Sequence, residues 1–312
     1  MRTRLHLHCR HRALSSSAEL HALKTRLLKD KFLFISGSAL LQILSNEFGL
    51  ETVETESLHK LRLWDSTTPQ TDEMGKEVYP YKGSLVAYYQ LNAHSSPGAF
   101  STSRVASMDY TAGESVIEHI DPTTAQNADK KTGLLPDHFR IHRTIPPLVD
   151  QNKVIIALQA FMMRCMLPVS WQCKTSDKIE TVLDYSAMMQ AQRVTKEGAG
   201  RNFFGEPGPE GIHQDAAALT AIILIDRQNV SLDSGQNRVW SIEQPAGKPS
   251  DADLTSARLL STGTLMSPFD ALIVLDREVK HEACPIIQDV PRLPAVRDVL
   301  TFEVRRKHEQ KD

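Results

Sequence analysis

The chain has 312 residues, of which 41% are hydrophobic and 24% charged, and these values are ordinary for a folded domain. They exclude a disordered chain, a collagen-like repeat and a small domain held together by disulfides. The 36 Lys and Arg residues nearly balance the 38 Asp and Glu residues. This balance argues against a protein dedicated to binding nucleic acid or a membrane surface.

The N-terminus is basic and the cysteines are scattered. The first twelve residues, MRTRLHLHCRHR, contain no acid and precede three serines, a composition found in transit peptides. We favour a disordered basic tail over residues 1–14 and a cytoplasmic protein. The four cysteines form no CxxC pair and no zinc-ligand spacing. No apolar run reaches the roughly 18 residues that span a membrane.

Two helices and a strand are predicted near the N-terminus. A leucine stripe predicts a helix over Ala18–Lys29, with Ser17 as its N-cap. The apolar run Phe32–Ile35 predicts a short strand. Ser38 is expected to cap a second helix, Ala39–Phe48, which ends at the glycine that follows it.

The rest of the chain is dominated by predicted strands and turns. Ser84–Leu91 is strand-like, whereas residues 94–114, 121–134 and 202–210 are rich in polar and turn-forming residues. Helical periodicity returns only over Lys153–Met166, whose Phe and Met side chains are expected in the core. Further strands are predicted at Trp171–Thr175, within Gly211–Ile225, and at Val239–Glu243, Ala271–Leu275 and Val299–Val304. Short strands at this spacing favour a β-sandwich or barrel, with helices on one sheet.

A His-x-Asp segment is the first chemical signal. His213 and Asp215 directly precede the apolar run Leu219–Ile225, and residues two apart on an extended segment point to the same face. Two histidines and one carboxylate form the facial triad of non-haem Fe(II) sites. The motif is short, and a second copy, His119-Ile120-Asp121, precedes a polar loop and is expected on the surface.

The second histidine of such a triad should come from a later strand. His281 follows the apolar strand at Ala271–Leu275 and is the preferred third ligand. His308 is the other downstream choice, but it lies in the charged segment RRKHEQKD, which we expect to be solvated.

Four segments in this order resemble a known superfamily. They are Gly211–Asp215 (GIHQD), Arg227–Asn229 (RQN), Leu275–His281 (LDREVKH) and Arg297–Leu300 (RDVL). Together they are similar to Fe(II)/2-oxoglutarate-dependent dioxygenases, and more narrowly to the branch of L-isoleucine hydroxylases and related oxygenases of free amino acids. The resemblance covers about residues 200–306 and departs from the branch at two positions, Ala216 and Leu275.

The resemblance implies a fold and a domain layout. The fold is α+β, a cupin-like double-stranded β-helix (jelly roll) with N-terminal helices packed on one sheet. A single domain is expected over residues 15–306, helical over about 15–75 and jelly roll over about 76–306. Residues 307–312 are expected to form a charged tail.

The same resemblance implies cofactors and ligands. Fe(II) would be held by His213, Asp215 and His281, and 2-oxoglutarate and O₂ are the co-substrates. The distal carboxylate of 2-oxoglutarate needs a buried cation, and Arg297 is the preferred one because a guanidinium binds a carboxylate in two places. The alternatives are a surface role for Arg297 or the use of Arg292; Arg305 and Arg306 are expected in solvent. No general base is implied.

Four further charged residues allow two interpretations each. Arg227 matches the branch pattern, but a structural ion pair with the segment Asp276-Arg277 is the preferred interpretation. Arg143 could bind a substrate carboxylate or lie on the surface.

The implied activity is oxidation of an unactivated C–H bond of a small apolar amino acid, by hydroxylation or by ring closure such as aziridine formation, with release of succinate and CO₂. Two alternatives are the same chemistry on a larger metabolite or a peptide-bound residue, and a cupin-like protein that binds metal or ligand without turnover. The partner is therefore expected to be a small molecule, not a nucleic acid or a membrane.

Overall fold

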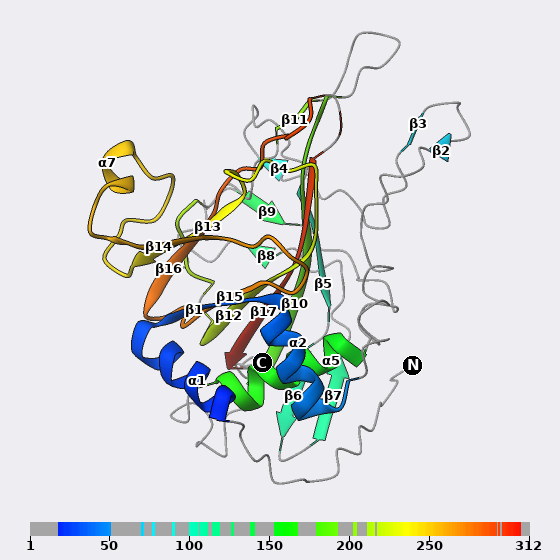
Figure 1. Ribbon diagram of the computed structural model, residues 1–312, viewed down its shortest axis with the longest axis vertical. Helices are drawn as coiled ribbons and strands as arrows, with labels where there is room; N and C mark the ends of the chain where they lie inside the picture. Colours follow the sequence, from blue (N-terminus) through cyan, green and yellow to red (C-terminus); the bar gives the residue numbers. More distant parts are fainter. Residues whose placement is uncertain are drawn as a thin grey trace.

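The computed structural model describes residues 18–50, 153–167, 211–215, 217–291, 293 and 295–306, and the backbone of further strands between residues 70 and 204. Helices and antiparallel sheets are mixed (Figure 1). Among the described residues, no helix combines the length and hydropathy needed to cross a bilayer.

The N-terminal elements follow the predicted order. Helix α1 (Ala18–Asp30), strand β1 (Phe32–Ile35) and helix α2 (Gly37–Phe48) confirm the leucine stripe and the short apolar strand. The predicted cap is wrong: Ser36, rather than Ser38, takes the extended N-cap conformation, and its hydroxyl accepts a hydrogen bond from the backbone N–H of Ala39. Helix α2 therefore begins two residues earlier than expected.

The larger sheet has the strand order β1-β15-β12-β17-β10-β11, with β5 also paired to β10. Its long strands β10 and β17 lie side by side near the centre of Figure 1. The bounds are β5 Phe100–Val105, β10 Ile179–Gln192, β11 Asn202–Phe204, β12 Leu219–Gln228, β15 Ala271–Val274 and β17 Ala295–Arg306.

The smaller sheet has the order β14-β13-β16. It contains β13 (Gln236–Ser241), β14 (Leu259–Thr264) and β16 (Val279–Ala283). The other paired strands are β2 (Gln70–Thr71) with β3 (Glu77–Val78), β6 (Ser107–Thr111) with β7 (Glu114–Glu118), and β9 (His138–Arg140) with β4 (Tyr89–Gln90) and β8 (Gln126–Asn127). Short helix α7 (Asp251–Leu254) lies beyond the smaller sheet (Figure 1).

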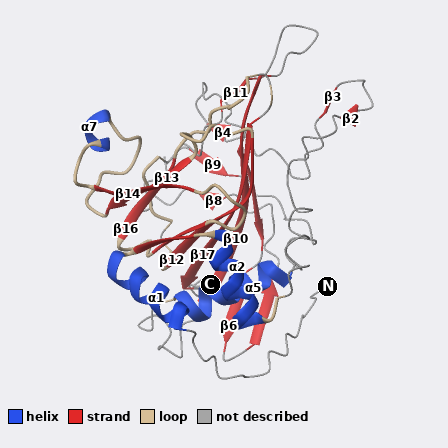
Figure 2. Cartoon of the chain, viewed as in Figure 1, coloured by secondary structure: helices blue, strands red, loops and turns tan. Residues whose placement is uncertain are grey.

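Helices cover one face of the larger sheet, as expected. Helix α5 (Lys153–Ala160) and the π-helical turn η1 (Phe161–Met166) join α1 and α2 at one end of the molecule (Figure 2). Phe161, Met162 and Met166 of the predicted Phe and Met stripe have no exposed surface. Along β12, Ala221 and Ile223 face this helical layer, whereas Ile222 packs in the cluster between the two sheets. The alternation follows from the two-residue period of a strand.

Several strand predictions need correction. Residues 94–114 were expected to form a loop but contain β5 and β6, and the expected turn at 202–210 begins with β11. Strands β10, β14 and β16 were not predicted, because none is a continuous apolar run. Of Ser84–Leu91, the structure describes a strand only at its end, β4. Trp171–Thr175 and Ser17 lie outside the described residues.

Candidate active site

The His-x-Asp segment lies just before β12 and pairs with β16 through its backbone. The N–H of His213 donates to the carbonyl of His281 at 3.0 Å, and the N–H of His281 donates back to the carbonyl of His213 at 3.0 Å. The two histidines are therefore direct neighbours across an antiparallel pair. His281 lies in the middle of strand β16 and is 3% exposed.

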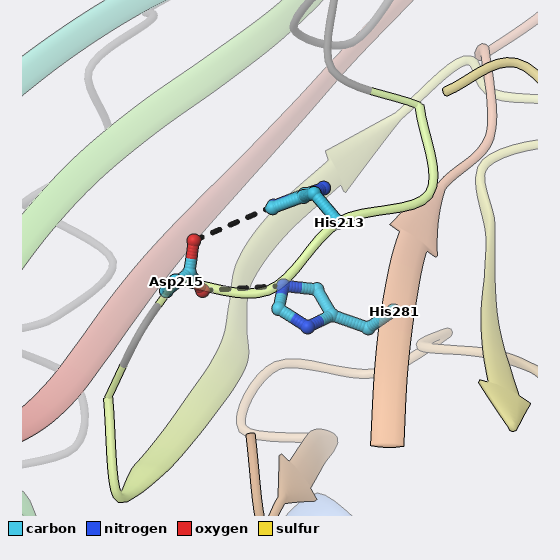
Figure 3. A group of neighbouring side chains, drawn as sticks. All are labelled: His213, Asp215 and His281. Atoms are coloured by element: carbon cyan, nitrogen blue, oxygen red, sulfur yellow. Dashed lines mark ion pairs between the residues drawn. The ribbon is translucent and has the colours of Figure 1, made fainter. Parts of the chain in front are cut away.

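The three side chains predicted as ligands meet at one point (Figure 3). The Nε2 atoms of His213 and His281 lie 3.4 and 3.2 Å from the two carboxylate oxygens of Asp215. One ligand atom from each residue lies within 4.8 Å of the others, a spacing that can hold a metal ion. Among the described residues this is the one such group of three or more His, Cys, Asp or Glu side chains.

The Nδ1 atom of each imidazole faces an oxygen. Nδ1 of His213 lies 2.8 Å from the carbonyl oxygen of Gly211, and Nδ1 of His281 lies 3.4 Å from a carboxylate oxygen of Asp276. With a proton on each Nδ1, both Nε2 atoms are placed to bind a metal once the proton on Nε2 of His281 has left. The Thr220 hydroxyl donates to Asp215 at 3.2 Å.

Charge also favours a metal at this site. Burial raises the pKa of Asp215, but the charge of His281 and hydrogen bonds with both histidines outweigh it, so the pKa lies well below its usual value. Burial lowers the pKa of His281, but Asp215 and then Asp276 outweigh it and raise the pKa to about 10. The carboxylate is thus ionised, and a metal ion would replace the proton that His281 holds.

Arg297 lies on β17 and is 1% exposed, so the surface role considered for it is wrong. Its Nη2 donates to the side-chain oxygen of Asn237 at 3.1 Å, while its Nε has no hydrogen-bond partner. Among the described residues, no carboxylate oxygen lies within 4.0 Å of its guanidinium. Burial, and then the charge of Arg227, lowers the pKa of Arg297 to about 10.

Two more buried donors point to the same need for an anion. Arg227 pairs with Arg297 in register across β12 and β17, and its Nη1 has no partner. The amide nitrogen of Asn237 is also buried without a partner. Buried donors without acceptors are costly, and a carboxylate ligand is one group that could supply acceptor oxygens here.

The predicted ion pair between Arg227 and the segment at Asp276 is wrong. Nη2 of Arg227 donates to the carbonyls of Ser231 and Ser234, at 2.7 and 2.9 Å. Asp276 instead accepts from the N–H of Ala217 and faces His281. The positions of His119, Arg143, Ala216, Arg292 and His308, and the side chains of Arg305 and Arg306, lie outside the described residues.

Gly211 sets the path of the chain into the metal-ligand segment. Its φ is +62°, and a Cβ there would lie 2.4 Å from the carbonyl oxygen of Gly247. We expect Gly211→Ala to lower the free energy of unfolding by about 1–3 kcal/mol, through backbone strain, and also to weaken metal binding. Denaturant unfolding and metal titration measure both effects.

Gly49 provides the control for this prediction. It has a similar φ, +66°, but a Cβ there would meet no atom within 4 Å. Gly49→Ala should cost stability by strain alone and leave metal affinity at the wild-type value. Equal metal affinity in both variants would show that Gly211 has no part in placing the ligands.

Comparisons with known proteins agree with this geometry. The model of a family described as 2OG-Fe dioxygenase matches residues 136–303. No curated protein gives a match. A solved structure described as the Fe(II)/(alpha)ketoglutarate-dependent dioxygenase TqaL is 16% identical, with a TM-score of 0.61 over 94% of this chain and 89% of that one.

Two further solved structures share the fold. A bsmA homolog from Methylobium petroleophilum PM1 is 18% identical, with a TM-score of 0.58 over 92% of each chain. IDO from Bacillus thuringiensis is 14% identical, with a TM-score of 0.55 over 93% of this chain and 100% of that one. The similarity of fold thus extends well beyond the residues that the family model matches.

Proposed function

Because the chain belongs to the 2OG-Fe dioxygenase family, we propose that it oxidises an unactivated C–H bond of a small, apolar, free amino acid. The enzyme uses Fe(II), 2-oxoglutarate and O₂, as this family does. The observation that carries the proposal is the group His213, Asp215 and His281, whose metal-binding atoms lie within 4.8 Å of one another.

The donor set fits Fe(II). Two neutral imidazoles and one ionised carboxylate are the protein ligands of non-haem iron oxygenases, and they leave three positions for co-substrate and oxygen. We assign these roles to His213, Asp215 and His281. Asp215 is kept ionised by its surroundings, and each histidine has its Nδ1 engaged elsewhere.

We assign Arg297 to the distal carboxylate of 2-oxoglutarate. The support is its complete burial, its unpartnered Nε and the absence of a carboxylate partner within the described part of the chain. Asn237 fixes one end of the guanidinium. Val299 packs between the sheets on the same face of β17, as the two-residue period predicts.

The bound iron supplies the oxidising chemistry. The protein's own residues would orient and shield: His213, Asp215 and His281 would hold the metal, Arg297 would bind the far end of the co-substrate, and the apolar cluster between the sheets would exclude water. We assign no general base, since none of these steps needs a proton removed from the substrate.

We also infer that the two sheets are those of a double-stranded β-helix. In support, β12, β15, β17 and β10 form the centre of one sheet, and β14, β13, β16 and residues 211–213 lie side by side in the other. The substrate class rests on the resemblance of the four sequence segments to those of free amino-acid oxygenases.

A substrate panel tests the proposal. Purified protein with Fe(II), 2-oxoglutarate and O₂ is given each free amino acid in turn, and succinate is measured. We expect one or a few apolar amino acids to raise succinate formation to about 1 s⁻¹ or more, with a product one oxygen heavier or two hydrogens lighter. Turnover only with larger metabolites or peptides would overturn the substrate class, and binding without any turnover would favour the cupin-like alternative.

A further inference from the structure

Asp276 is a wholly buried carboxylate between the two segments that carry the metal ligands. We propose that Asp276 is a positioning residue for the metal ligands, an inference that rests on the proposed metal site. Asp276 would orient the His281 imidazole toward the metal and hold the segment around Asp215 next to it. The proposal assigns it a role distinct from an ion pair with a neighbouring arginine.

Asp276 touches both segments at once. Its Oδ1 lies 3.4 Å from Nδ1 of His281, and neither atom has a hydrogen-bond partner of its own. Its Oδ2 accepts from the backbone N–H of Ala217 at 3.2 Å. Its carbonyl oxygen accepts from the side-chain amide of Gln214. Gln214 and Ala217, on either side of Asp215, are therefore both hydrogen-bonded to Asp276, which also faces His281.

This arrangement makes the two imidazoles unequal. His213 is held by a neutral acceptor, the carbonyl of Gly211, whereas His281 faces a carboxylate. A carboxylate partner fixes the proton on Nδ1, keeps the Nε2 lone pair toward the metal and makes the imidazole a stronger donor. The two imidazoles thus differ in the charge of the group that faces Nδ1.

The position requires a carboxylate because it faces two donors. The N–H of Ala217 and the Nδ1–H of His281 lie against different oxygens of Asp276. An asparagine has one carbonyl oxygen and one NH₂ group. It could satisfy either donor, but its NH₂ group would then face the other, and a proton forced onto Nε2 of His281 would block metal binding.

The test compares Asp276→Asn with Asp270→Asn in titrations of the full chain with Co(II). Asp270 lies at the other end of β15 and also accepts backbone N–H groups, from Gly37 at 2.7 Å and from Met266 and Ser267 at 2.8 Å each. Both variants should lower the unfolding temperature. Only Asp276→Asn should lose Co(II) affinity, by about 10–100-fold, with an altered absorption spectrum of the bound ion.

The outcomes separate this inference from the proposed function. Wild-type affinity in Asp276→Asn, or an equal loss in Asp270→Asn, overturns the role of Asp276. A wild-type protein that binds no Co(II) overturns the metal site itself. If Asp276→Asn does not fold, proton NMR of the Co(II)-loaded wild type decides: two shifted, exchangeable Nδ1–H signals support the proposal, and a single one overturns it.

Discussion

Replacing His213 or Asp215 with alanine is expected to abolish Fe(II)-dependent succinate formation while the protein stays folded. Each variant removes one of the three ligands that the site offers, so the loss should exceed about 100-fold, the upper end for removing an outer-shell partner. Both side chains are 18% exposed, and the main-chain pairing of residues 213 and 281 does not depend on either. Succinate assays and thermal unfolding measure the two halves of this prediction.

An exposed histidine provides the matched control. His21 lies on the outer face of α1, and His21→Ala should keep wild-type activity and metal content. Full activity in His213→Ala or in Asp215→Ala would show that the catalytic metal is held elsewhere.

Arg297→Ala should raise the KM for 2-oxoglutarate far more than the KM for the amino-acid substrate. Removing one partner of a buried ion pair costs about 3–5 kcal/mol, which corresponds to about 150- to 5,000-fold in affinity. The side chain is 1% exposed, so solvent cannot take over its role. Steady-state kinetics with each substrate varied in turn measure the difference.

Arg238 is the control for this variant. It lies on β13 next to Asn237 in sequence, but its guanidinium faces Glu282 at 3.5 Å. Arg238→Ala should leave the KM for 2-oxoglutarate unchanged. If Arg297→Ala also left it unchanged, the co-substrate would have to be bound by another cation, and Arg227 would be the first to test.

The sequence was most informative where the signal lies within a few neighbouring residues. The leucine stripe predicted α1 and the short apolar run predicted β1, because in both the apolar pattern is local. His213 and Asp215 were found because they stand two apart before an apolar strand. His281 was chosen because it follows a later apolar strand, whereas the role of Arg297 came from the family resemblance.

The features that the sequence could not predict depend on contacts between distant segments. In the sequence Asp276 is one of several charged residues in LDREVKH, and only the fold brings it to Ala217, 59 positions earlier. Asn237 meets Arg297 across 60 positions. Strand β10 pairs on both sides, with β17 and β5, but its sequence mixes polar and apolar residues and lacks the apolar run that marks β12. Likewise, Ser36 caps α2 because its backbone is extended there, which sequence does not show.

The main-chain bonds between His213 and His281 have a consequence for the lifetime of the enzyme. Metal sites that form only when the ion binds lose their structure with it. Here two 3.0 Å backbone hydrogen bonds hold the imidazole-bearing residues together, so their spacing is set by the sheet rather than by the ion. We therefore expect a chelator that removes the iron to inactivate the enzyme reversibly, with the protein still folded and no refolding needed for reloading.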